Sequence, residues 1–260
     1  METLLIDRRD GVVTVTMNSP TKKNAASGAM FEELLETFRE IERNRDDRCM
    51  VLTGAGEDFC TGADLSDPSG PAMDPHSPGM VRMRRLGDVA MSLHALSKPA
   101  IARIDGLCVG AGLSLALGCD LLVASSRARL SMIFTRRGLS PDMGASWLLP
   151  RQVGMARAKE LVLLADIIDA DRALAMGLIN EVVDATELDD RVGEIAARLA
   201  SGPTIALTLS KTLLNNSFST SMFQALEDEG RAQSVNFASA DTIEAITAFL
   251  EKRPAKFEGR

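Results

Sequence analysis

The sequence predicts an α/β protein. Short apolar strands alternate with segments of helical periodicity, the links between them are brief, and glycines gather where strands end. Strands separated by helices pair in parallel, because a parallel pair needs a long crossover connection. The 260 residues are enough for one large domain or two small ones.

Local patterns justify the first elements. Two strands are expected around Asp10 and Gly11, since Asp-Gly between apolar runs is a strong hairpin signal. A helix is expected after Ser27, a good N-cap, because apolar residues then recur at helical spacing. The segment 66–80 is rich in proline and predicts a loop.

The remaining elements follow from the same rules. A short apolar run between turn residues predicts a strand, and apolar residues three or four apart over a longer run predict a helix. Strands are expected at 49–56, 99–106, 119–125, 128–133 and 181–184, and helices at 28–43, 81–96, from within 109–118, over most of the chain after 145, and as one long helix within 221–252.

Composition narrows the function. A net charge of −7 and the absence of tyrosine disfavour a nucleic-acid partner, which needs a basic or aromatic face. No apolar run reaches the ~18 residues of a membrane span, and the first residues carry no apolar export signal, so a cytoplasmic protein without a membrane partner is expected. Four scattered cysteines and two histidines lack metal-ligand spacing, which predicts no metal site and reduced, buried thiols.

Three glycine-rich segments, 52–65, 104–121 and 138–154, each follow a predicted strand. Strand ends that face helix starts are where α/β proteins place ligands. Backbone N–H groups at helix N-termini are unpaired, and two of them from different loops can form an oxyanion hole. Glycines among apolar residues therefore predict close approach of a ligand to the backbone, with tight packing as the alternative.

Other glycine motifs fit poorly. There is no phosphate-binding G-x-x-x-x-G-K-[ST] loop, and the dinucleotide fingerprint fails because Leu115 stands where its third glycine is needed. The stretch around Ser114 resembles a nucleophile elbow, but the triad order requires a later histidine and none follows His94. A serine hydrolase is therefore disfavoured.

Four motifs cover nearly the whole chain in order: SPTKKNAAS at 19–27, FCTGADL at 59–65, IARIDGLCVGAGLSLALGCDL at 101–121 and AFLEKRPAKF at 248–257. Together they resemble the crotonase family, the enoyl-CoA hydratases and isomerases. The resemblance implies a spiral of ββα units over 1–200 and a C-terminal helical region over 201–260 that forms a homotrimer or a dimer of trimers.

The same resemblance implies an acyl-CoA thioester substrate and no separate cofactor, since coenzyme A is part of the substrate. The N–H groups of Ala63 and Ala111 correspond to the donors that bind the thioester oxygen and stabilise an enolate. Substrate contacts are expected from Lys22, Lys23, Ala25, Gly62, Asp64, Leu65, Gly110, Ser114, Phe134 and Trp147.

The sequence departs from the family's hydratases, which use two glutamates acting through one water. Ser114 stands at the first of these positions, and Phe134 or its neighbour Ile133 at the second. No acidic residue lies between Asp120 and Asp142, and a serine of ordinary pKa is a poor base. The two-glutamate hydration mechanism is therefore not expected.

Asp142 is the remaining acid near this region. Its surrounding segment resembles family members that isomerise double bonds in unsaturated or ring-derived acyl-CoAs. Burial among Trp147, Met143 and Leu139 is expected to raise its pKa, which would suit a proton-transferring base. The alternative is a carboxylate that only caps the next helix.

Three functions remain open at this stage. The first is an enoyl-CoA isomerase-type enzyme with Asp142 as base. The second is a hydratase or hydrolase that uses a water held by Ser114 and Asp142. The third is a non-catalytic acyl-CoA-binding relative. His76, in the proline-rich loop, is a further candidate for the acyl pocket.

Overall fold

The computed structural model describes residues 3–67 and 78–260. His76 and most of the predicted proline-rich loop lie outside these residues. Among the described helices, none is long and apolar enough to cross a membrane.

The larger of two sheets has six strands, and its order follows the chain. The hairpin of β1 (Leu4–Arg9) and β2 (Val12–Met17) is antiparallel, and every later neighbour in this sheet is parallel. Asp10 and Gly11 both have positive φ, as the predicted tight turn requires. The later strands are β3 (Cys49–Gly54), β4 (Ala100–Ile104), β6 (Leu121–Ser125) and β9 (Glu181–Val183).

The spiral of ββα units arises because the chain passes repeatedly from the large sheet to a smaller one. The smaller sheet contains β5 (Leu107–Val109), β7 (Arg129–Ser131) and β8 (Ile168–Asp169). The chain enters the large sheet as β4, crosses to the small sheet as β5 and continues into α3 (Ala111–Leu117). It then repeats the crossing with β6 and β7. The predicted spiral of ββα units is confirmed, although the short strand β8 was not predicted.

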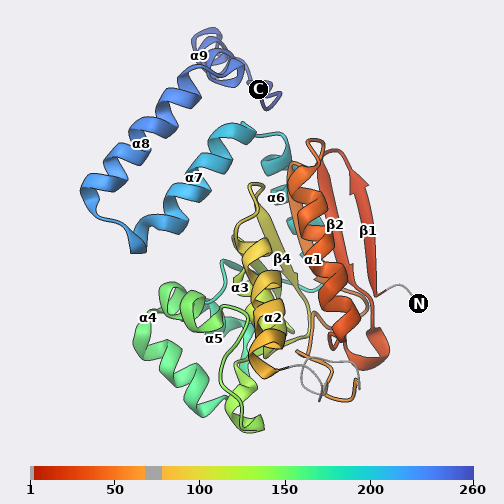
Figure 1. The fold of residues 1–260 in the computed structure, drawn as a ribbon. Coiled ribbons are helices and arrows are strands. Elements are labelled where there is room, and N and C mark those ends of the chain that lie inside the picture. Colours follow the sequence, from red (N-terminus) through yellow and green to blue (C-terminus); the bar gives the residue numbers. More distant parts are fainter. Residues whose placement is uncertain (1–2, 68–77) are drawn as a thin grey trace.

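Both faces of the large sheet are covered. In β3 the side chains alternate: Met50 and Leu52 pack towards α1 (Gly28–Arg43), whereas Cys49 and Val51 pack against α6 (Leu188–Ala200). The predicted N-cap of α1 is confirmed, because the Ser27 side chain accepts a hydrogen bond from the Met30 N–H. The helix α2 (Gly79–His94) packs beside α1 (Figure 1).

The C-terminal helices extend away from this body as an arm (blue in Figure 1). The arm consists of α7 (Thr204–Asn216), α8 (Met222–Phe237) and α9 (Ala240–Glu251). The expectation of one long helix within 221–252 is wrong. The hydroxyl of Ser239 accepts a hydrogen bond from the Thr242 N–H and so starts a new helix.

A second expectation also fails. The glycine-rich segment at 138–154 follows a short 3-10 helix, Ile133–Arg137, rather than a strand. The chain turns there because Gly138 adopts a left-handed conformation at the helix end. The segment then enters α4 (Ala145–Leu164), which is followed by α5 (Ala170–Ala175).

Candidate active site

Two parallel backbone bridges, Ala26–Ala63 and Cys60–Cys108, place the Ala63 loop against its neighbours. Ala26 pairs with Ala63 in a parallel bridge, in which the Ala26 N–H donates to Gly62 O at 2.8 Å and the Asp64 N–H donates to Ala26 O at 2.8 Å. These two hydrogen bonds are made by Gly62 and Asp64, the residues on either side of Ala63. The N–H of Ala63 itself therefore points away from the bridge.

Ala111 is the first residue of α3, so its N–H has no partner within the helix. Within residues 3–67 and 78–260, no recorded hydrogen bond uses the N–H of Ala63 or of Ala111. Both alanines follow glycines of positive φ, Gly62 at +96° and Gly110 at +58°. Each of the two predicted N–H donors therefore directly follows a glycine in a left-handed conformation.

The two loops touch. A Cβ placed on Gly62 would lie 3.4 Å from the Ala111 nitrogen and 3.2 Å from the Val109 oxygen. A Cβ placed on Gly112 would lie 2.4 Å from the Cys60 carbonyl oxygen, far inside a normal contact. At Gly112 the close approach is that of the neighbouring loop, which is the tight packing given as the alternative, and the approach of a ligand to the N–H groups of Ala63 and Ala111 stays a prediction.

Asp142 carries an unsatisfied, buried carboxyl oxygen. Its Oδ1 is shielded from solvent and has no hydrogen-bond partner among the described residues. Burial raises the pKa of Asp142 to about 6. The capping alternative is not supported, because α4 begins after Gly144 without any side-chain cap bond.

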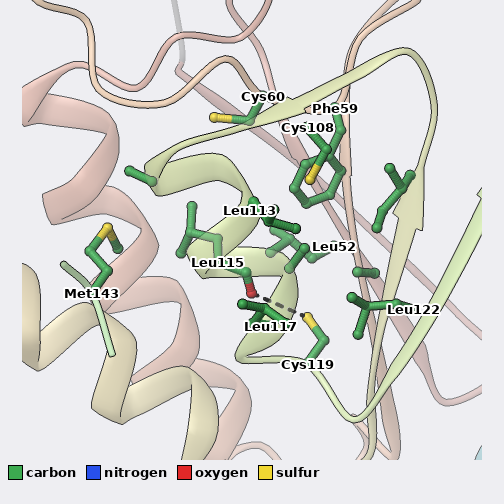
Figure 2. Packing of buried hydrophobic residues seen from close by; sticks show 14 of the residues in the cluster. Leu52, Phe59, Cys60, Cys108, Leu113, Leu115, Leu117, Cys119, Leu122 and Met143 are labelled. Atoms are coloured by element: carbon green, nitrogen blue, oxygen red, sulfur yellow. Dashed lines mark hydrogen bonds between the residues drawn. The ribbon is translucent and has the colours of Figure 1, made fainter. Parts of the chain in front are cut away.

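The segment that carries Asp142 is anchored to the elements around Ala111. Ile133, in the 3-10 helix before it, would lie 3.6 Å from a Cβ on Gly110. Met143 is buried in the same cluster as Leu113 and Leu115 of α3, as Figure 2 shows. The segment that carries this carboxyl group of raised pKa therefore packs into the same core as α3, whose first residue is Ala111.

The positions of the hydratase glutamates hold no acid. Ser114 is 1% exposed, and its hydroxyl donates to the Gly110 carbonyl oxygen of its own helix at 3.3 Å. Phe134 is buried in the core cluster. The two-carboxylate arrangement for activating a water is therefore missing at both positions.

Two of the predicted substrate contacts, Lys22 and Asp64, form an ion pair with each other. The Lys22 Nζ pairs with Asp64 Oδ2 at 2.6 Å, and Asp64 Oδ1 accepts from the Ser66 N–H at 2.9 Å. The Lys22 ammonium is the main reason that the pKa of Asp64 lies below its ordinary value. Asp64 thus orders its loop, and its predicted contact with the substrate stays a prediction.

The neighbouring predicted residues are less buried. The Lys23 carbonyl oxygen accepts from the Thr61 N–H at 3.2 Å, and the Lys23 side chain is exposed. Ala25 is half-buried, and Leu65 is exposed. Lys23, Ala25 and Leu65 thus stand near Ala63 in the chain or in the loop bonded to it, and their contacts with a substrate stay predictions.

Trp147 lines a cavity whose lining does not include Ala63, Ala111 or Asp142. Its ring meets His94 edge-on, with centroids 5.3 Å apart, and the Arg151 guanidinium lies 3.7 Å from its centre. These side chains line a cavity of about 450 Å³ next to α7. Trp147 is 37% exposed and Leu139 is 52% exposed, so of the three predicted neighbours of Asp142 only Met143 is buried.

Asn24 is a structural residue next to the Ala63 loop that was not predicted individually. It is fully buried, and its amide nitrogen donates to Ala55 O at 2.8 Å and to Asp58 O at 2.7 Å, while its oxygen accepts from the Ser19 N–H. It ties the 19–24 turn to the loop after β3. Its place in the motif SPTKKNAAS was the available signal.

Comparisons with known proteins agree with this geometry. A family model described as enoyl-CoA hydratase/isomerase matches residues 7–260. The 1,2-epoxyphenylacetyl-CoA isomerase of Escherichia coli is 39% identical, with 100% of each chain covered. The short-chain-enoyl-CoA hydratase of Clostridium acetobutylicum is 34% identical, covering 100% of this chain and 98% of that protein. The crystal structure of an enoyl-CoA hydratase from Bacillus anthracis matches with a TM-score of 0.94 at 31% identity and full coverage of both chains.

The spiral of strands, the paired donor loops and these matches along the whole chain lead to one assignment. The chain belongs to the enoyl-CoA hydratase/isomerase family and has its crotonase fold.

Proposed function

We propose that this protein is an acyl-CoA isomerase-type enzyme in which Asp142 moves a proton on an enolate held by Ala63 and Ala111. The observation that carries the proposal is the half-buried Asp142 carboxyl, whose Oδ1 is shielded from solvent without a hydrogen-bond partner among the described residues and whose pKa is about 6. A general base works best when its pKa lies near the operating pH. The name of the Escherichia coli relative, 1,2-epoxyphenylacetyl-CoA isomerase, supports isomerisation of an acyl-CoA thioester.

The proposed reaction needs no atoms from outside the substrate. Asp142 takes a proton from a carbon next to the thioester, and the electrons of that C–H bond move to the thioester oxygen. The N–H groups of Ala63 and Ala111 stabilise the resulting enolate oxygen. Asp142 then returns the proton at a different carbon, which shifts the double bond and restores the carboxylate.

Binding is proposed to rest on the loops around the donors. Lys22 and Lys23 are exposed cations next to the Ala63 loop and can meet coenzyme A phosphates. The reaction requires neither a metal nor a further cofactor, because the protein's own N–H groups stabilise the charge.

Hydration is the second candidate, because the Clostridium relative is named a hydratase. In this protein it would need a water held by Ser114 and Asp142. The Ser114 hydroxyl already donates within α3, which leaves a single carboxylate for both proton transfers.

Isotope exchange separates the candidates. Enoyl-CoA is incubated with the protein in D₂O, and deuterium in recovered substrate and products is located by mass spectrometry. Deuterium at the α- or γ-carbon with a moved double bond is expected, because the proton on the Asp142 carboxyl exchanges with D₂O in a fraction of turnovers before it is returned. Rapid formation of a hydroxyacyl-CoA instead would support hydration, and tight binding without exchange would support a non-catalytic protein.

The pH dependence of kcat/KM gives a second test. Asp142 must be ionised to accept a proton, and burial raises its pKa to about 6. We therefore expect kcat/KM to rise with pH and to reach half its plateau near pH 6, falling about tenfold per unit below it. A plateau that extends to pH 4, near the ordinary value for aspartate, would contradict the role of Asp142.

The C-terminal arm is proposed to assemble copies of this chain into a trimer or a dimer of trimers. Its helices leave many large apolar side chains exposed, which a monomer rarely tolerates. They include Leu214, Phe218, Met222, Phe223, Leu226, Phe237, Ile243, Ile246, Phe249 and Leu250.

A charge on the arm is expected to separate the subunits. Phe249 is 82% exposed in one chain, so Phe249→Asp should leave the fold intact and bury a charge in the assembly. Light scattering after size exclusion should show a trimer or hexamer for the parent protein and a smaller particle for the variant. Leu5→Asp on β1 is the control, and a parent protein that is monomeric would disprove the assembly.

A further inference from the structure

Cys60 lies beneath both donor loops and is fully buried. Its Sγ accepts a hydrogen bond from the Gly62 N–H at 3.4 Å. Gly62 has a φ of +96° and immediately precedes Ala63. The thiol therefore contacts the residue whose conformation sets the direction of the Ala63 N–H.

The main chain of Cys60 holds the other loop. Its N–H donates to Leu107 O at 2.9 Å, and its carbonyl oxygen accepts from the Val109 N–H at 2.9 Å. A Cβ on Gly112 would lie 2.8 Å from the Cys60 Cβ, so the backbone directly after Ala111 packs against this residue. Figure 2 shows Cys60 above α3 and Cys108 next to Phe59.

The thiol remains neutral in this environment. Burial raises the pKa of Cys60 to about 12, and the amides of Gly62 and Ala26 only partly oppose this rise. A neutral thiol in an apolar site is a poor nucleophile but an adequate acceptor for one N–H. Its chemistry thus fits a supporting contact rather than a reacting group.

We infer that Cys60 is a positioning residue: its side chain accepts the Gly62 N–H and its backbone binds the Ala111 loop, which together fix the spacing of the two oxyanion donors. This inference rests on the proposed function, because it requires the N–H groups of Ala63 and Ala111 to bind the same oxygen. Donors fixed before the reaction act mainly on the charged transition state.

Kinetics of three variants test the inference. Cys60→Ala removes the acceptor and should lower kcat about tenfold with KM nearly unchanged, since a small displacement of positioning groups is costly. Cys60→Ser keeps an acceptor and should recover most of kcat. Cys108→Ala is the matched control: it loses the same atoms from an equally buried residue of the same bridge, whose thiol makes no hydrogen bond recorded among the described residues.

A measurement on the free protein separates this inference from the proposed function. Hydrogen exchange and the NMR shift of the Gly62 amide should change in Cys60→Ala and stay unchanged in Cys108→Ala. An unchanged Gly62 amide, or equal kinetic losses in the two alanine variants, would overturn the role of Cys60. Failure of the proposed function would appear instead as a parent protein that performs no proton exchange.

Discussion

Replacing Asp142 with asparagine is expected to lower the rate of proton exchange at least about 100-fold, the usual contribution of a general base. Asparagine keeps the size of the side chain but cannot accept the proton. Because Ala63 and Ala111 are untouched, acyl-CoA binding should change little. The measurements are deuterium incorporation under single-turnover conditions and acyl-CoA binding by calorimetry.

The stability of this variant gives an independent check. The folded pKa of Asp142, about 6, lies above the ordinary value, so ionisation destabilises the folded state as pH rises from about 4 through 6. Asp142→Asn should therefore be at least as stable as the parent at pH 7 while losing activity. The exposed Asp184→Asn is the control, and exchange that survives Asp142→Asn would remove Asp142 from the mechanism.

Local chemistry explains which parts of the fold could be predicted. The Asp10-Gly11 turn and the Ser27 cap depend on residues within a few positions, and both are confirmed. The spiral rests on four motifs whose order implies a known arrangement. The break at Ser239 was missed because the apolar spacing continues through it, and only the capping hydroxyl marks the new helix.

The candidate site was predictable only in part. The donors follow from motif positions, and the raised pKa of Asp142 follows in direction from its apolar neighbours. The position of Trp147 in the cavity beside α7 could not be predicted, because it depends on packing with His94 of α2 and with Arg151 one helical turn later. The hydrogen bond from the Gly62 N–H to the Cys60 thiol could not be predicted from the sequence either. Scattered cysteines usually indicate small buried side chains and give no sign of a specific contact.

Gly112→Ala is expected to lower the free energy of unfolding by about 3 kcal/mol, at the upper end for overpacking a core. The added Cβ would meet the Cys60 carbonyl oxygen at 2.4 Å, and a backbone atom cannot rotate away as a flexible side chain can. If α3 moves to relieve the clash, it carries the Ala111 N–H with it, so kcat should fall about 100-fold even in the folded fraction.

Gly193→Ala is the matched control. Gly193 lies in the middle of α6 on its solvent-exposed side, and nothing lies within 4 Å of the new methyl group. That control should gain about 0.5–1 kcal/mol from helix propensity. Urea denaturation and single-turnover kinetics measure both variants, and a Gly112→Ala protein as stable and active as the parent would contradict the close approach of the two loops.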